Sequence, residues 1–261
     1  MSDFAVILAV ATAAALASPA GGLIALWRAP TSLFMSLSLG FASGVLLATV
    51  SFEMLPKSLE LAPLPAVLGA FAAGFALVYA LDLFIHRGQI AGEKAEQRKA
   101  VERRRLRRKP RGDGVTVLAS ATSVEELIEG VSTGIGAAIQ PGLGLMVALA
   151  ILVDNVSEAL SIGQLIRDQQ GGSRREKARR VLQWTGLIGA SLFVSALVGW
   201  FFLRGLPEPV LGGLFAAGAG GMFYLTVTDL LPEAEARHYL QSAALAASAG
   251  FLLIFGLGRL H

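Results

Sequence analysis

Two segments in the middle of the chain place acidic side chains inside long apolar surroundings. The polar residues concerned are Glu125, Glu126, Glu129, Asp154, Asn155 and Glu158. Residues four positions apart share one face of a helix, so Glu125 aligns with Glu129. In the second segment Asp154 aligns with Glu158 in the same way. The spacing therefore predicts one carboxylate column on each of two successive helices, with Glu126 and Asn155 beside the columns.

The position of these acids predicts a chemistry. Each group begins about ten residues into an apolar stretch, near the middle of a bilayer, where a charged side chain costs at least about 2.5 to 3.5 kcal/mol. No Lys, Arg or His stands in the central part of any apolar stretch, which excludes internal ion pairs. Proton uptake or bound cations remain as the two ways to neutralise the carboxylates. Because clustered carboxylates form a hard oxygen cage, we predict a divalent metal site made by all six polar residues.

An alternative explains the same acids without metal. They can be protonated and hydrogen-bonded across helices, since hydroxyl groups stand close by in the sequence. The hydroxyl residues are Thr122, Ser123, Ser132, Ser157 and Ser161. In this alternative those hydroxyls help to hold the protonated acids by hydrogen bonds across helices.

Eight predominantly apolar stretches of about 20 residues must position the acids. They cover residues 4–27, 33–55, 66–85, 115–139, 144–166, 181–203, 210–231 and 239–257. The chain is 54% hydrophobic and only 16% charged, far more apolar than a soluble fold of this size. It has no cysteine, which excludes disulfides and thiolate metal sites. We predict an all-α integral membrane protein with eight transmembrane helices, forming a single transmembrane domain over residues 1–261.

Charge placement predicts the orientation. Most Lys and Arg residues fall in the odd-numbered connections, above all in a basic linker at 87–114. By the positive-inside rule these connections are cytoplasmic and both termini lie outside, in a multi-pass protein of the cell (inner) membrane. The run from Arg103 to Arg111 is explained by a charged cytoplasmic linker, with contact to anionic lipid as the alternative. Nucleic-acid binding is not expected.

Internal similarity relates pairs of stretches. Aligning the fourth stretch on the fifth superimposes the two acidic groups and also matches Ser132 with Ser161 and Gly134 with Gly163. Because consecutive spans run in opposite directions, this is an inverted repeat, as in many transporters. The second and seventh stretches each carry an acid, Glu53 and Asp229, three residues before a proline that we expect to close the helix. We expect these two acids at the outer and inner mouths of a pathway, with ordinary interfacial charges as the alternative.

Residues 125–130 and 154–159 resemble the metal motifs of the ZIP (Zrt-, Irt-like) family of divalent metal transporters, and residues 39–47 and 224–233 are similar to other family segments. The resemblance covers essentially the whole chain. It implies a 3+2+3 arrangement of helices, outward termini, a homodimer, and movement of metal to the cytoplasm by an elevator-like alternation. It also implies a first metal site and a second that shares Glu158. The first site would comprise Glu125, Glu129, Asp154 and Glu158, and the second Glu126, Asn155 and Glu158.

The sequence departs from the family pattern in its ligands. Carboxylates replace the family histidines, and the chain's own His86, His238 and His261 lie at span ends or the terminus. An all-oxygen set suits Mg, Mn or Fe(II) better than zinc. Ile128 and Ser157 replace two helix-kinking prolines, so straighter helices are expected.

A further departure lies in the sixth stretch. Gly189 stands where many family members place a metal-binding Glu, which weakens the second site.

The function predicted is transport of a divalent cation such as zinc, iron or manganese into the cytoplasm, with the metal as substrate and no organic cofactor. The expected partners are metal ions, the lipid bilayer and a second copy of the chain. Two alternatives remain: a proton-coupled carrier of a small solute, and a metal-binding membrane sensor that does not transport. An enzyme is not expected, because no nucleophile or acid pair stands in the motif context of a membrane hydrolase.

Overall fold

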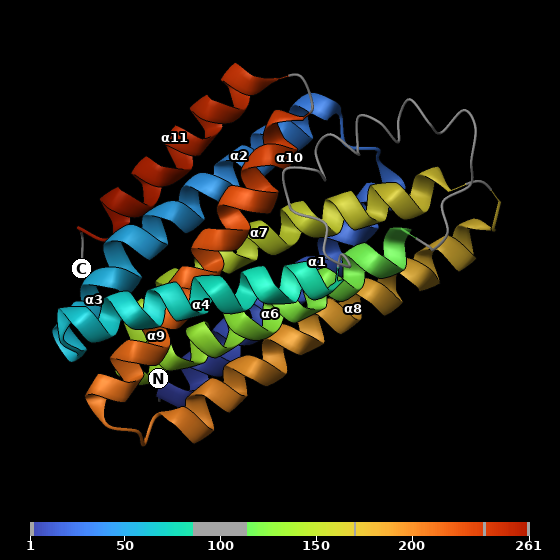
Figure 1. Cartoon of the computed structure of the whole chain (residues 1–261). Coiled ribbons are helices and arrows are strands. Elements are labelled where there is room, and N and C mark those ends of the chain that lie inside the picture. Colours follow the sequence, from blue (N-terminus) through green and yellow to red (C-terminus); the bar gives the residue numbers. More distant parts are fainter. Residues whose placement is uncertain (1–2, 86–113, 170, 237–238, 260–261) are drawn as a thin grey trace.

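The described part of the chain is entirely helical. The computed structural model describes residues 3–85, 114–169, 171–236 and 239–259, and these contain no strand (Figure 1). The prediction of an all-helical fold is therefore confirmed for the described residues. The linker predicted at 87–114 lies outside the described residues except for Gly114, as do the basic run 103–111 and all three histidines.

The helices follow the predicted stretches. The first half contains α1 (Asp3–Trp27), α2 (Ser32–Ala48), the π-helical segment η1 (Thr49–Met54), α3 (Leu55–Leu61) and α4 (Leu64–Ile85). The middle contains α6 (Gly114–Ile139) and α7 (Pro141–Asp168). The last part contains α8 (Arg174–Val198), the π-helical η2 (Gly199–Leu203), α9 (Glu208–Leu225), the π-helical η3 (Thr226–Leu230), α10 (Leu231–Glu235) and α11 (Leu240–Leu257). Each of the eight predicted stretches is thus helical.

One long helix, α6, is less apolar than the others. Within the described residues, seven helices are long and apolar enough to cross a membrane. Helix α6 has the necessary length, 26 residues, but Glu125, Glu126 and Glu129 reduce its apolar character. The helix that differs is therefore one of the two that carry the candidate site.

The prediction that Pro56 and Pro232 close their helices is wrong. Helix α2 continues through η1 and α3 to Leu61, and α9 continues through η3 and α10 to Glu235. In both cases the residue just before the proline donates its N–H five residues back, Leu55 to Val50 O and Leu231 to Thr226 O. A π-helical turn shifts the hydrogen-bond ladder where proline offers no donor, so the helix continues.

Local signals set the start of α8. The Ser173 hydroxyl accepts a hydrogen bond from the Glu176 N–H, and the Glu176 carboxylate accepts one from the Ser173 N–H. This reciprocal cap starts the helix at Arg174, seven residues before the predicted boundary. The preceding turn uses Gly171 and Gly172, whose φ angles of 83° and 78° are accessible mainly to glycine.

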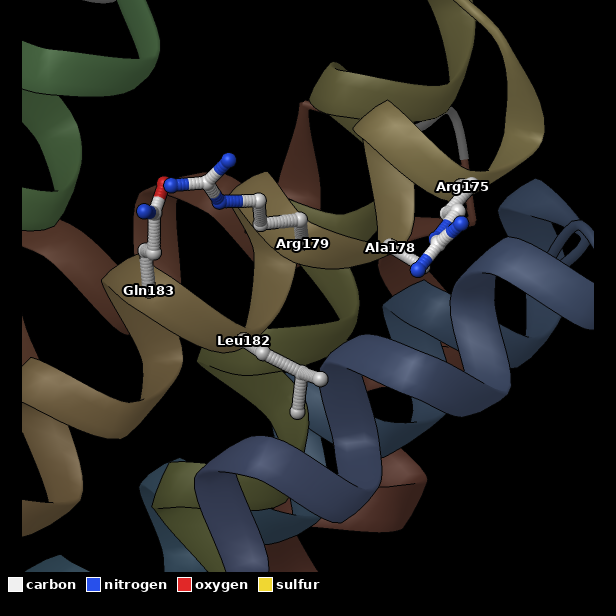
Figure 2. Close-up of a pocket in the computed structure, with 5 residues that line it drawn as sticks. All are labelled: Arg175, Ala178, Arg179, Leu182 and Gln183. Atoms are coloured by element: carbon white, nitrogen blue, oxygen red, sulfur yellow. The ribbon is translucent and has the colours of Figure 1, made fainter.

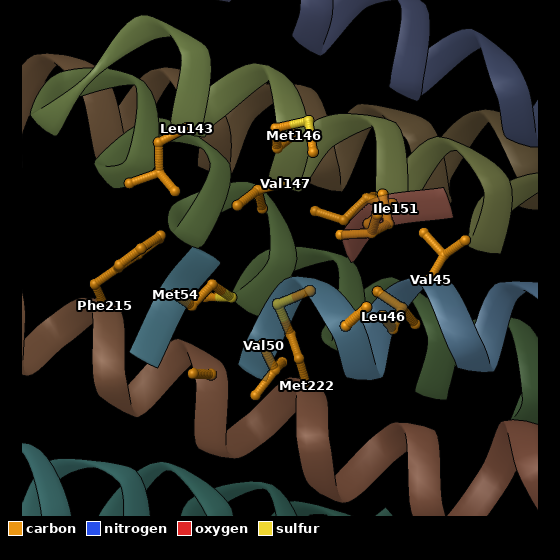
Figure 3. Close-up of a cluster of buried hydrophobic side chains, with 14 of the residues drawn as sticks. Val45, Leu46, Val50, Met54, Leu143, Met146, Val147, Ile151, Phe215 and Met222 are labelled. Carbon is orange, nitrogen blue, oxygen red and sulfur yellow. The ribbon is translucent and has the colours of Figure 1, made fainter. Parts of the chain in front are cut away.

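The helices pack as a central group with two flanking pairs. Helices α1, α6, α7 and α8 pack on one another, whereas α2 pairs with α11 and α4 pairs with α9. The flanking pairs approach closely at glycine: a Cβ on Gly44 would collide with the Ala247 carbonyl, and one on Gly74 with that of Ala217. Figure 3 shows the apolar cluster that joins the parts, where side chains of α2 and η1 meet those of α7 and α9. Its largest fully buried member is Phe215.

Candidate metal centre

The acidic groups lie on facing stretches of α6 and α7, which pack against each other in antiparallel directions. Glu126 is 1% exposed, Glu129 4%, Asp154 3% and Asn155 1%, so all four side chains are buried. Glu125 and Glu158 are partly buried. Glu126, expected beside the carboxylate column, is therefore buried as deeply as any acid of the group.

Several oxygen atoms of this group are buried without a hydrogen-bond partner among the described residues. They are both carboxylate oxygens of Glu126, Oδ1 of Asp154 and Oδ1 of Asn155, although the Asn155 side chain lies close enough to the Glu126 carboxyl group to interact with it. Leaving a buried acceptor unpaired costs about 1 to 3 kcal/mol, and more if it is charged. No ion pair joins Glu126, Glu129 or Asp154 to any Lys or Arg in the described part of the chain. Such a concentration of partnerless oxygens is the kind of exception that an ion explains.

The carboxyl groups are close enough to influence one another. Asp154 lies within range of charge interaction with Glu126, Glu129 and Glu158. Glu125 lies within range of the same three glutamates. Among the described residues, however, no three His, Cys, Asp or Glu side chains converge tightly enough to form a ready-made metal site. The acids gather in one region, and ligation of a single ion would require their carboxylates to move closer.

Two neighbouring helices fix the polar groups. The Asn155 Nδ2 donates to the Ala14 carbonyl of α1 at 3.3 Å, which orients the amide of Asn155 and leaves its Oδ1 free. The Ser195 hydroxyl of α8 donates to the Glu126 carbonyl at 3.2 Å. Helix α1 thus holds the side chain of Asn155, and helix α8 holds the backbone of Glu126.

The nearby hydroxyls are mostly engaged elsewhere. Ser123, Ser132 and Ser157 each donate to the carbonyl four residues earlier in their own helix. Ser161 donates to Glu233 at 3.3 Å and not to Glu158. These four hydroxyls therefore do not donate to the central acids, although their oxygens can still accept a hydrogen bond from a protonated carboxyl group.

Ser132 also stands in the letters Gly-x-Ser-x-Gly at residues 130–134, which by spelling match a hydrolase motif. It lies inside α6 and not at a strand-to-helix turn, and its hydroxyl bonds to the Ile128 carbonyl. A nucleophile of that class needs an exposed turn. The match therefore has no catalytic context.

The two acids expected at the mouths of a pathway have different surroundings. Glu53 lies in η1, partly buried, and its Oε1 approaches Gly258 at the end of α11. Asp229 lies in η3, partly buried, and within range of charge interaction with Asp154. Asp229 is therefore closer to the central acids than its expected position suggests.

Sequence reasoning missed two acidic residues. Asp82 of α4 is 8% exposed and accepts a hydrogen bond from the Tyr224 hydroxyl of α9 at 2.9 Å. Glu233 of α10 accepts the hydrogen bond from Ser161, three residues beyond Glu158 on α7. The available signal for Asp82 was its place near the end of a predicted apolar stretch.

Gly189 has a structural explanation. A Cβ at this position would collide with the Ala15 carbonyl of α1, so the glycine permits close packing of α1 and α8. A longer side chain does not fit there without moving a helix.

Comparison with known proteins identifies related metal transporters. The family model for the ZIP zinc transporter matches residues 86–258. The zinc transporter ZupT of Corynebacterium efficiens is 33% identical over 260 residues, covering 93% of this chain and 94% of the relative. ZupT of Corynebacterium glutamicum is 32% identical, covering 93% and 96%, and that of Escherichia fergusonii is 28% identical, covering 82% and 80%. These relatives are named as transporters and not as enzymes. On the match to the family model and the identity over nearly its full length, the chain belongs to the ZIP zinc transporter family.

Proposed function

We propose that this chain carries divalent metal cations across the cell membrane, using the acids of α6 and α7 as the binding site. The observation that supports this most is the set of buried, partnerless oxygens on Glu126, Asp154 and Asn155. A divalent cation supplies the positive charge that the described residues do not. It also gives each of these oxygens a partner.

The proposed ligands follow the two-site expectation. The first site uses Glu125, Glu129, Asp154 and Glu158, and the second uses Glu126, Asn155 and the shared Glu158. Glutamate side chains have several rotatable bonds, so a bound ion can draw carboxylates together that stand apart without it. The number of ions that bind therefore depends on how the carboxylates rearrange around the metal.

The ligand atoms bear on which metal is carried. Carboxylate and amide oxygens suit Mn, Fe(II) and Mg, yet aspartate and glutamate also ligate zinc at about 2.0 to 2.2 Å. The relatives are named zinc transporters. We propose zinc, iron or manganese as substrates, with no organic cofactor.

The helix packing supports a 3+2+3 arrangement of eight spans with inverted repeats. The contacts of α1 with α7 are mirrored by those of α8 with α6, and those of α2 with α11 by those of α9 with α4. Glycines repeat the correspondence, since Gly134 of α6 packs on α8 and the aligned Gly163 of α7 packs on α1. The same symmetry supports reading Glu53 and Asp229 as related positions along the pathway, with Asp229 near the central acids.

The division into a central group and flanking pairs is suited to an elevator-like motion. The site-bearing helices α6 and α7 pack with α1 and α8, and this group could move as a unit against the pairs α2 with α11 and α4 with α9. We propose inward transport, both termini outside, cytoplasmic basic connections, the inner membrane as location, and a homodimer.

The proposal is tested by metal uptake into proteoliposomes that contain the purified chain. Wild type should accumulate Zn²⁺ or Mn²⁺, whereas Glu129→Gln and Glu158→Gln should lose most of that uptake, because each removes a proposed charged ligand. Glu208→Gln is the matched control, since Glu208 is exposed in the first turn of α9. Normal uptake by both site variants would refute the proposal.

The same assay separates the alternatives. A proton-coupled solute carrier would carry protons in the complete absence of metal, measured with an internal pH dye. A metal sensor would bind the ion tightly by calorimetry without accumulation in the vesicles. Either result would replace transport of metal as the function.

A further inference from the structure

The basic residues at the start of α8 divide into two sets by their contacts. Lys177 Nζ donates to the carbonyls of Arg167 and Gln169, both at 2.7 Å, and Arg180 Nη1 donates to Gln169 Oε1 at 2.7 Å. These bonds tie the start of α8 to the carboxyl end of α7, where cationic donors satisfy free carbonyls. Lys177 and Arg180 therefore have a structural role.

Arg175 and Arg179 lie one turn apart on the other side of the helix. Together with Ala178, Leu182 and Gln183 they line an open pocket of about 490 Å³ (Figure 2). Both arginines are exposed, and no ion pair joins either of them to another described residue. Among the described residues, no acid lines the pocket.

Exposed apolar side chains follow the pocket along α8, spread over its uncovered side. Leu182 is 46% exposed, Leu187 48% and Val194 56%. These residues follow Arg179 along the helix on its uncovered side, in a segment apolar enough to span a membrane. Cationic groups at one end and exposed apolar groups beyond them match the two parts of a phospholipid.

Trp27 indicates the level of the pocket in the membrane. Helix α1 runs antiparallel to α8, with Gly22 against Val181 and Gly189 against Ala15. The end of α1 therefore lies beside the start of α8, and Trp27 there is 73% exposed. Exposed tryptophan is typical of the interface between headgroups and hydrocarbon. The two arginines thus stand at the height of lipid phosphates.

We propose that Arg175 and Arg179 form a binding site for the headgroup phosphate of an anionic phospholipid, with an acyl chain against Leu182. Guanidinium groups present several N–H donors in a planar fork that matches phosphate oxygens. The site is independent of the metal centre, so it stands even if the proposed function fails.

The test uses the full-length protein in mixed micelles that contain equal amounts of phosphatidylglycerol and phosphatidylethanolamine. Native mass spectrometry measures which lipid stays bound. Wild type should retain phosphatidylglycerol in preference, and Arg175→Gln with Arg179→Gln should lower that retention about tenfold or more. The matched control, Arg204→Gln with Arg259→Gln at exposed positions that do not line the pocket, removes the same net charge and should behave as wild type.

A second variant and a competition experiment complete the test. Leu182→Glu leaves both arginines in place but puts a negative charge in the pocket, so it should reproduce the loss if the double variant aggregates. Millimolar inorganic phosphate should not displace the lipid, because it lacks the acyl chain. Equal retention of the two lipids by wild type, unchanged retention in the arginine and Leu182 variants, equal loss in the Arg204 and Arg259 control, or displacement by phosphate would each overturn the proposal.

Discussion

Replacing Glu126 by Gln should have opposite effects on stability with and without metal. Both oxygens of Glu126 are buried without a hydrogen-bond partner in the described chain, and so are Oδ1 of Asp154 and Oδ1 of Asn155. A glutamine amide of the same shape offers N–H donors to these oxygens. Because an unpaired buried polar group costs about 1 to 3 kcal/mol, the metal-free variant should be more stable than wild type by about 1 kcal/mol or more.

The metal response should change in the other direction. At a free metal concentration of 100 times Kd, binding stabilises wild type by about 2.7 kcal/mol. If loss of one charged ligand weakens binding about a hundredfold, the same concentration gives only about 0.4 kcal/mol. Since 1 kcal/mol corresponds to about 2 to 4 °C in Tm for a protein of this size, a shift of about 5 to 10 °C should fall to about 1 °C.

The assay is thermal unfolding of detergent-solubilised protein, with chelator or with Mn²⁺ or Zn²⁺. Glu208→Gln serves as the control, because Glu208 is exposed and should alter neither value much. A Glu126→Gln protein that is less stable than wild type in chelator, yet keeps the full metal-induced shift, would contradict the reasoning. In that case Glu126 would be a structural residue and not a ligand.

Three other substitutions test the packing that holds the site. Gly189→Glu introduces the residue common in the family, but it should not improve metal binding. It should lower Tm by several degrees, because even a Cβ there would collide with the Ala15 carbonyl. The control Gly186→Ala, which faces open space on the same helix, should leave Tm unchanged. Tyr224→Phe should destabilise by about 1.5 to 3 kcal/mol in chemical unfolding, since it removes a hydrogen bond to the buried Asp82 carboxyl. Ser173→Ala should cost about 1 kcal/mol by the same measurement, through loss of the reciprocal cap of α8.

The apolar stretches were enough to predict the helices but not their ends. Hydrocarbon thickness sets the length of an apolar run, so all eight stretches are helical as expected. Helix α8 begins earlier than its apolar part because a cap at Ser173 stabilises a charged first turn. The prolines were misread because the π-helical segments before Pro56 and Pro232 depend on hydrogen-bond register, which residue type alone does not reveal.

The composition of the candidate site was predicted more fully than its geometry. Acids without basic partners in apolar surroundings indicated the right two helices, because burial of charge is costly wherever it occurs. Which acids face inward depends on how α6 packs against α8 and α7, and the structure buries Glu126 and leaves Glu125 partly exposed. The pairing of Asp82 with Tyr224 joins residues 142 positions apart, and only the packing of α4 on α9 reveals it.

Anomalous X-ray scattering from crystals grown with Mn²⁺ or Zn²⁺, recorded at the absorption edge of the metal, tests the central idea most directly. The account predicts an anomalous peak between α6 and α7, ligated by oxygens of Glu126, Asp154 or their four partners at about 2.0 to 2.2 Å for zinc. A fully loaded crystal in which the metal lies only at surface residues, with those buried oxygens still unligated, would contradict it.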